Sequence, residues 1–180
     1  MKKLFILSIL SLLSSCVANS QESIIGNQFS DHKRVAILED FDKVSDTTFY
    51  VNQEIDNEYS LLNLKKANND LIVYSLINSA PNEKRSYMVL DTLMIKLKNS
   101  EKITIGYCEF DLRNQKTGNI IALVETIDNK KMFNQNIKAA WRANSHTKKI
   151  EKIENIENLQ CFNAWYNGEV GRINYDELKN

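Results

Sequence analysis

Three cysteines are the residues of this chain whose type and position point most directly to chemistry. Cys16 follows two lysines, an apolar run from Leu4 to Leu13, and the small pair Ser14-Ser15. A cationic start, an apolar stretch of roughly 7–15 residues and small residues before a cut are the marks of a secretory signal peptide. A membrane span needs about 20 apolar residues, so this run is too short to serve as one. The pattern predicts export, with residues 1–15 removed as the signal peptide.

The order Leu13-Ser14-Ser15-Cys16 resembles the lipobox of bacterial lipoproteins. The resemblance implies transfer of a diacylglyceryl group to the Cys16 sulfur, cleavage before Cys16, and acylation of its amine with a chain such as palmitate. Each buried CH₂ contributes about 0.8 kcal/mol, so several acyl chains form a stable membrane anchor. Val17 stands where an Asp would favour inner-membrane retention, so we expect the outer membrane, on its periplasmic or surface face. The alternative is an ordinary signal peptide with a chance cysteine.

The rest of the chain has the composition of one packed domain. We expect a lipidated tether over residues 16–23 and a single globular domain over residues 24–180. An apolar fraction of 43% argues for a packed core and against disorder. Without the two lysines of the signal, 21 basic side chains face 23 acidic ones. This balance excludes the strong positive field that a nucleic-acid partner requires.

Cys108 and Cys161 are the two cysteines that remain once Cys16 is committed to lipid. An even pair in an oxidising compartment favours a disulfide bond. In the chain-entropy model, closing a loop of about 54 residues stabilises the fold by roughly 4 kcal/mol. Two free buried thiols are the alternative.

Residue patterns for catalysis, metals or cofactors do not emerge from the sequence. The five glycines are scattered, and neither a Gly-x-Ser-x-Gly elbow nor a His-Glu-x-x-His pair occurs. His32 and His146 sit among polar neighbours and are expected in surface loops. The run Glu39–Asp42 lacks the order of an EF-hand, so a solvated loop is favoured over a Ca²⁺ site. We expect a protein without a cofactor, without a metal and without enzymatic activity.

Asp91 is the most unusual carboxylate, because it lies within the apolar run Val89–Ile95. A buried carboxylate would need a partner and would have a perturbed pKa. A position at a strand edge or a bulge, facing water, explains it more simply than a catalytic role.

Two tryptophans fall in the C-terminal part of the chain. Trp141 is expected in the core. Trp165 and Tyr166 are adjacent and close to the end of the chain, and such residues often anchor protein interfaces. They are therefore candidate partner-binding residues, with a place in the core as the alternative.

The spacing of apolar residues predicts a mostly β domain. Period-two alternation and β-branched runs predict strands over residues 34–38, 47–51, 71–77, 87–97, 103–108, 119–126 and 150–153, with a short helix as the alternative for 87–97. Residues 59–64 and 71–77 are expected to form a hairpin, with a helix as the alternative for the first of them because Ile55, Tyr59 and Leu62 recur at helical spacing. A helix is predicted over residues 130–141, because five apolar residues there recur on about one helical face. The fold class is then mostly β (α+β), with an antiparallel sheet or barrel-like domain and one or two helices.

The segment from Lys138 to Arg142, followed by Cys161, resembles the end of small uncharacterised lipoproteins of Bacteroidetes-type bacteria. That resemblance implies no activity. The leading expectation is a lipid-anchored, non-enzymatic binding or accessory module, held to the membrane through Cys16 and acting on another envelope protein. The alternative is a carrier of a small apolar ligand in a β-barrel cavity, although lipocalin-like carriers usually have a Trp on the first strand. The sequence does not indicate an oligomeric state.

Overall fold

The computed structural model describes residues 24–50, 57–79, 84–106, 108–110, 118–125, 132–134 and 136–163. Within these ranges the chain is mostly β, and its only helical residues are in short 3₁₀ turns, including a 3₁₀ helix at His32–Arg34. No helix in the described ranges is long and apolar enough to cross a membrane.

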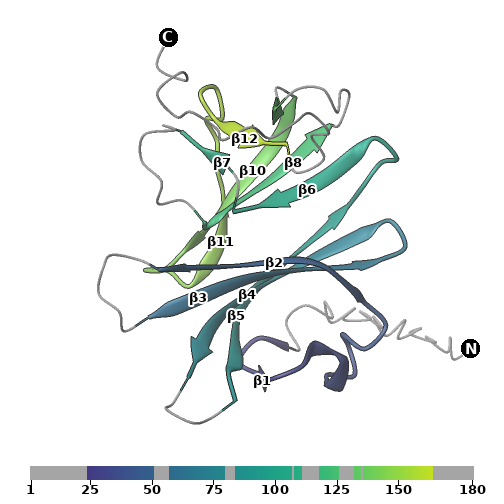
Figure 1. Cartoon of the computed structure of the whole chain (residues 1–180), viewed down its shortest axis with the longest axis vertical. Helices are drawn as coiled ribbons and strands as arrows, with labels where there is room; N and C mark the ends of the chain where they lie inside the picture. Colours follow the sequence, from purple (N-terminus) through teal and green to yellow (C-terminus); the bar gives the residue numbers. More distant parts are fainter. Residues whose placement is uncertain are drawn as a thin grey trace, which may run out of the picture.

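The first part of the chain forms a five-stranded antiparallel sheet that is strongly curled (Figure 1). Its strands are β1 (Gln28–Phe29), β2 (Asp42–Tyr50), β3 (Glu58–Lys66), β4 (Asn69–Asn78) and β5 (Ser86–Lys96), in the order β1-β5-β4-β3-β2. The turn at Ala67 and Asn68 joins β3 to β4, and Ala67 has a positive φ of 55°. The expected hairpin is therefore confirmed.

The second part of the chain forms two smaller sheets (Figure 1). The four-stranded sheet has the order β11-β10-β8-β6 and consists of β6 (Glu101–Ile105), β8 (Ile120–Glu125), β10 (Ile137–Asn144) and β11 (Lys149–Lys152). The three-stranded sheet has the order β7-β12-β9 and consists of β7 (Cys108–Glu109), β9 (Phe133–Asn134) and β12 (Gln160–Phe162). All pairings between described strands are antiparallel.

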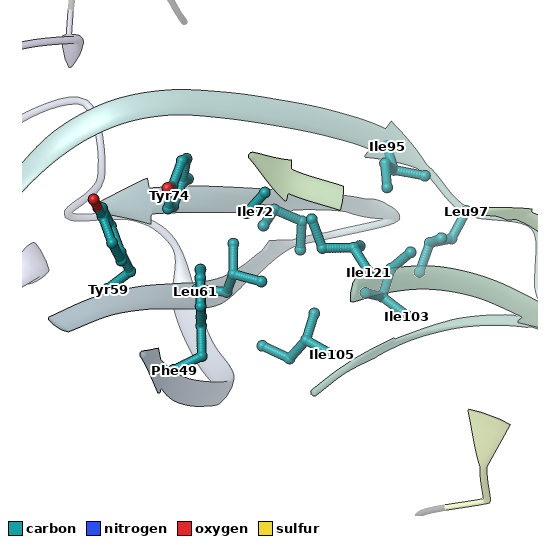
Figure 2. Close-up of a cluster of buried hydrophobic side chains, with 11 residues drawn as sticks. Phe49, Tyr59, Leu61, Ile72, Tyr74, Ile95, Leu97, Ile103, Ile105 and Ile121 are labelled. Atoms are coloured by element: carbon teal, nitrogen blue, oxygen red, sulfur yellow. The ribbon is translucent and has the colours of Figure 1, made fainter. Parts of the chain in front are cut away.

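The facing surfaces of the two larger sheets form the inner core of the protein. Side chains from β2, β3, β4 and β5 meet side chains from β6, β8 and β10 there (Figure 2). The buried members are Phe49, Tyr59, Leu61, Ile72, Tyr74, Ile95, Leu97, Ile103, Ile105, Ile121 and Ala143. Leu61, Ile72 and Ile121 are completely buried. Burial of this apolar area is the main stabilising contribution, at about 25 cal/mol per Å² removed from water.

Each of the two larger sheets is also covered on its outer face. The N-terminal segment 24–41 places Ile24 and Leu38 against Leu71 and Val73 of β4. On the other side of the molecule, the three-stranded sheet covers Ile120, Ala122 and Val124 of β8. Strands buried on both faces have continuous apolar runs rather than alternating ones. This is why residues 71–74 of β4 are all buried.

The two larger sheets approach each other along both long edges. β2 lies beside β6, and β5 lies beside β11. At the first edge, Gly106 has a positive φ of 76°, and a Cβ on it would come within 2.8 Å of the Thr47 Oγ1 atom. A Cβ on Gly118 would come within 2.9 Å of the Phe49 Cβ atom. Glycine at these two positions permits the close approach of the loops to β2.

Most of the predicted strands are confirmed. The structure has strands at six of the seven predicted places, although their ends differ by several residues: β2, β4, β5, β6, β8 and β11. The expected antiparallel, mostly β class is correct, and the five-stranded sheet is curled like half a barrel.

The helix predicted over residues 130–141 is wrong. The described residues of this segment form β9 and the first part of β10, and none of them is helical. In β10, Trp141 and Ala143 point to the inner core, whereas Ala140 points to the outer core beneath the three-stranded sheet. Apolar residues on both faces of one strand gave a spacing that imitated a helical face.

The strand predicted over residues 34–38 is also wrong. A short 3₁₀ helix at His32–Arg34 is followed by turns, with hydrogen bonds from the Leu38 N–H to the Val35 carbonyl and from the Phe41 N–H to the Leu38 carbonyl. Leu38 is completely buried against the five-stranded sheet. The apolar residues of this segment therefore cover a sheet instead of joining one.

Replacing Gly106 with Ala tests the close approach between β2 and the loop after β6. Both Gly106→Ala and Gly26→Ala introduce a side chain at positive φ, at a cost of about 1 kcal/mol. Nothing lies within 4 Å of a Cβ on Gly26, so that variant serves as the control. We expect Gly106→Ala to lose about 1–3 kcal/mol more than the control in urea unfolding, because of overpacking against Thr47. Equal losses in the two variants would contradict the predicted contact.

Candidate functional site

Asp91 lies at the seam where β5 of the five-stranded sheet runs beside β11 of the four-stranded sheet. Tyr74 pairs with Asp91 and Ser75 pairs with Val89, so Leu90 is the additional residue of a β-bulge. A bulge bends its strand and changes the direction of a side chain. The expectation of a bulge at Asp91 is confirmed.

The Asp91 side chain turns towards β11 rather than towards water, with only 15% of its surface exposed. Its Oδ2 atom accepts a hydrogen bond of 2.7 Å from the Ile150 backbone N–H. Its Oδ1 atom lies 3.7 Å from the Lys149 Nζ atom. The expectation that Asp91 faces water is therefore wrong, because the carboxylate satisfies a backbone donor of an edge strand. The arrangement joins the two sheets.

A row of aromatic rings lies at one end of the inner core. The ring centroids of Phe49 and Tyr59 are 5.6 Å apart, those of Phe49 and Tyr74 are 6.1 Å apart, and those of the two tyrosines are 5.7 Å apart. Figure 2 shows Tyr59 and Tyr74 together at one end of the buried cluster. Both tyrosines are almost completely buried, so their hydroxyl groups need partners within the fold.

Lys148 approaches these rings from the turn between β10 and β11. Its Nζ atom donates a hydrogen bond of 2.5 Å to the Tyr59 hydroxyl oxygen and lies 4.7 Å from the ring centroid. An ammonium group over an aromatic ring is attracted by the ring quadrupole. The contact therefore ties the β10–β11 turn to β3 of the opposite sheet.

The Tyr74 hydroxyl is buried and has no hydrogen-bond partner among the described residues. Burial raises the pKa of Tyr74 far above its usual range, and the neighbouring Tyr59 adds to the effect. The hydroxyl therefore keeps its proton at any physiological pH and remains a donor.

A second buried polar pair lies in the β3–β4 hairpin. The Asn63 Nδ2 atom donates a hydrogen bond of 3.1 Å to the Asp70 Oδ2 atom, and both residues are buried. Burial raises the pKa of Asp70, and this effect outweighs the opposing influences of the Asn63 hydrogen bond and the Lys65 charge. The two remaining oxygens of the pair have no partner among the described residues.

Cys108 and Cys161 form a disulfide bond, as predicted. They are directly opposite each other on β7 and β12, and both are completely buried. Together with Leu159 they pack on the outer face of β8. The bond therefore fastens the three-stranded sheet over the four-stranded sheet.

The other residues selected from the sequence do not gather at one place. His146 is exposed in the β10–β11 turn, as expected. His32 belongs to the 3₁₀ helix, and 13% of its side-chain surface is exposed, so the expected surface loop is wrong for it. Trp141 is partly buried and packs against the inner core, in agreement with its expected place.

The acidic run at residues 39–42 forms ion pairs with lysines. Asp40 lies 2.7 Å from the Lys66 Nζ atom, and Asp42 lies 3.1 Å from the Lys33 Nζ atom. The hydrogen bond and charge of Lys66 hold the pKa of Asp40 below its usual value. Among the described residues, no group of three or more His, Cys, Asp and Glu could hold a metal ion.

Cys16, Trp165 and Tyr166 lie outside the described residues. Lipidation and partner binding at these positions therefore remain expectations from the sequence. Sequence reasoning missed the cluster of Tyr59, Tyr74 and Lys148, because Lys148 and Tyr59 are 89 residues apart and meet only through the packing of the two sheets.

Comparisons with known proteins do not identify a relative of this chain. No protein-family model, no curated protein and no solved structure matches the chain.

Replacing Asp91 with Ala tests the connection between the two sheets. We expect a loss of about 1–3 kcal/mol in the free energy of unfolding, because the Ile150 N–H would lose its acceptor. Asp91→Asn retains an acceptor oxygen and should lose less. Lys149→Met is the matched control and should change stability by at most about 1 kcal/mol, because exposed ion pairs contribute little. Equal effects of Asp91→Ala and Lys149→Met in urea unfolding would contradict a role for the backbone hydrogen bond.

The Asp70 carboxyl should make the fold less stable as the pH rises. Its pKa is higher in the folded than in the unfolded state, so its contribution is complete below the unfolded pKa and is lost as the pH passes the folded pKa. We therefore expect the stability of Asp70→Asn, relative to the unmodified protein, to increase between acidic and neutral pH. Urea unfolding across this range measures the difference.

Asp40→Asn is the control of opposite sign. Lys66 lowers the pKa of Asp40, so this carboxyl stabilises the fold above its unfolded pKa and loses that effect as the pH falls. Asp40→Asn should be the less stable protein at neutral pH, and the difference should vanish in acid. If both variants followed the same trend, the assignment for Asp70 would be wrong.

The disulfide bond should account for a measurable share of stability. Its two cysteines are separated by 53 residues, and a native disulfide typically contributes roughly 2–5 kcal/mol in such a domain. We expect Cys108→Ala combined with Cys161→Ala to reduce the unfolding free energy by that amount. In denaturant, these cysteines of the unmodified protein should react with a thiol reagent only after reduction. Reaction without a reductant would show that the bond is absent.

Proposed function

We propose that this chain is a lipid-anchored protein of the bacterial cell envelope, and that its β domain is a non-enzymatic binding or accessory module for another envelope protein. The signal peptide covers residues 1–15, and acyl chains on Cys16 attach the mature protein to the outer membrane. The module has no nucleic-acid partner.

The observation that carries the proposal is the buried disulfide bond between Cys108 and Cys161. Disulfide bonds form and persist in exported proteins and are rare in a reducing cytosol. A signal sequence before Cys16 and a structural disulfide after it are independent features that agree on the same compartment.

The packing of the domain supports surface binding over transport of a ligand inside it. The facing side chains of the two larger sheets pack on each other in the inner core, with completely buried residues such as Leu61, Ile72 and Ile121 at its centre. Packed interiors have few voids larger than a water molecule. The alternative of a small-ligand carrier has support only from the curled, barrel-like sheet. Native mass spectrometry that reveals a co-purifying apolar molecule would favour that alternative.

A Cys16→Ser variant tests the anchor, and cross-linking tests the partner. We expect the unmodified protein to incorporate a labelled palmitate analogue, to sediment with membranes and to cross-link to a defined envelope protein in intact cells. Cys16→Ser should lose the label and the membrane association, because several acyl chains supply the anchoring free energy.

Ser14→Ala is the matched control, because it exchanges one small residue for another and leaves Cys16 intact. It should retain the label and the membrane fraction. Membrane retention of an unlabelled Cys16→Ser protein would disprove lipid anchoring. An anchored protein that gives no specific cross-link would disprove the accessory role.

A further inference from the structure

Lys148 occupies a turn position whose backbone conformation is uncommon for a residue with a side chain. Lys148 has a φ of +59°, in the left-handed region that residues with a Cβ rarely adopt. Gly or Asn is the usual residue at such a turn position. A lysine occupies this position, and its ammonium group reaches the Tyr59 hydroxyl. Strain of this kind is found where the surrounding structure or a function requires a particular side chain.

Hydrogen-bond donors outnumber acceptors where Lys148 contacts Tyr59, whose ring lies beside that of Tyr74. One N–H of Lys148 is directed to the Tyr59 oxygen, which leaves two N–H groups of the ammonium. Because the Tyr59 oxygen accepts this bond, its own proton is available to another acceptor. The Tyr74 hydroxyl is buried without a partner among the described residues. Asp91 pairs with Tyr74 across β4 and β5, but its Oδ2 atom accepts from the Ile150 N–H and its Oδ1 atom lies 3.7 Å from the Lys149 Nζ atom, and the Tyr74 hydroxyl donates to neither oxygen.

From this geometry we infer that Tyr59, Tyr74 and Lys148 form a binding site for a small oxyanion, a carboxylate or a phosphate group. Two neutral hydroxyl donors and one ammonium supply both the charge and the hydrogen bonds that such a group accepts. The ligand would satisfy the Tyr74 hydroxyl, which the described residues leave without a partner. Lys148 is exposed as a residue, so a change in its side-chain rotamer can open the tyrosine pair to a ligand.

The site goes beyond the proposed function and does not depend on it. A chain without lipid or without a protein partner would still carry the three donors. Failure of this inference would therefore leave the anchoring and accessory role unaffected, and the reverse also holds.

Calorimetric titration of the full chain in detergent tests the site. The probes are sodium phosphate and sodium acetate, each added at constant ionic strength against sodium chloride. We expect saturable binding of at least one probe. Lys148→Met should weaken it by about tenfold, because the charge-assisted hydrogen bonds are lost. Tyr74→Phe should weaken it by about fivefold, because one hydrogen bond is lost from a side chain of unchanged shape.

Lys152→Met is the control, because Lys152 lies on the neighbouring strand and pairs with Glu154. It should bind the probe as the unmodified protein does. The probe that binds more tightly identifies the class of ligand as a carboxylate or a phosphate. The inference is overturned if neither probe binds, or if Tyr74→Phe and Lys148→Met, both shown to be folded by circular dichroism, bind as tightly as Lys152→Met.

Discussion

Burial of both faces of both larger sheets is the constraint on which the rest of this structure depends. A sheet that packs on one side only can leave polar residues on the other, but β4 and β8 carry apolar side chains on both faces. The inner core buries one apolar face of each sheet. The N-terminal segment 24–41 and the three-stranded sheet must therefore cover the two outer faces. Both elements are required to keep apolar side chains out of water. Exposed outer faces would present large apolar patches to water, which favour association.

The two covers are held by different kinds of interaction. Segment 24–41 is held by apolar burial through residues such as Ile24 and Leu38, by turn hydrogen bonds, and by exposed ion pairs that contribute little. The three-stranded sheet has very short strands, and such strands provide few ladder hydrogen bonds. The disulfide bond compensates for these few hydrogen bonds by restricting the unfolded chain. The three-stranded sheet therefore depends on a covalent bond, whereas segment 24–41 does not.

Much of the fold could be predicted from local patterns, whereas the sites that join the sheets could not. Thr47, Phe49 and their neighbours have strand composition, and Ile103 and Ile105 alternate with polar residues, so β2 and β6 were evident. β10 is not, because apolar residues lie on both of its faces and obscure the period of two. The segment after Arg34 has the composition of a strand but covers a sheet, and local sequence does not distinguish covering a sheet from joining it.

The polar contacts between the sheets join residues that are far apart in the sequence, so local patterns do not predict them. Asp91 meets Ile150 across 59 residues of chain, and Tyr59 meets Lys148 across 89. A carboxylate within an apolar run signals that some partner exists, which is why Asp91 was recognised as unusual, but the identity of the partner is a property of the packing. The sequence does not mark Lys148 as unusual, because lysines are common in polar turns. Its positive φ is evident only from the structure.

The positions of these contacts limit where the protein can act on other molecules. The inner core is occupied by its own side chains, and the outer faces of the sheets are occupied by their covers. What the packing leaves for recognition is the surface, together with the end of the inner core at which the Tyr74 hydroxyl has no partner among the described residues. At that end, β3 and β4 of one sheet and the β10–β11 turn of the other contribute to one cluster. A ligand bound there would contact both sheets at once, and it would therefore stabilise their association as well as occupy a site.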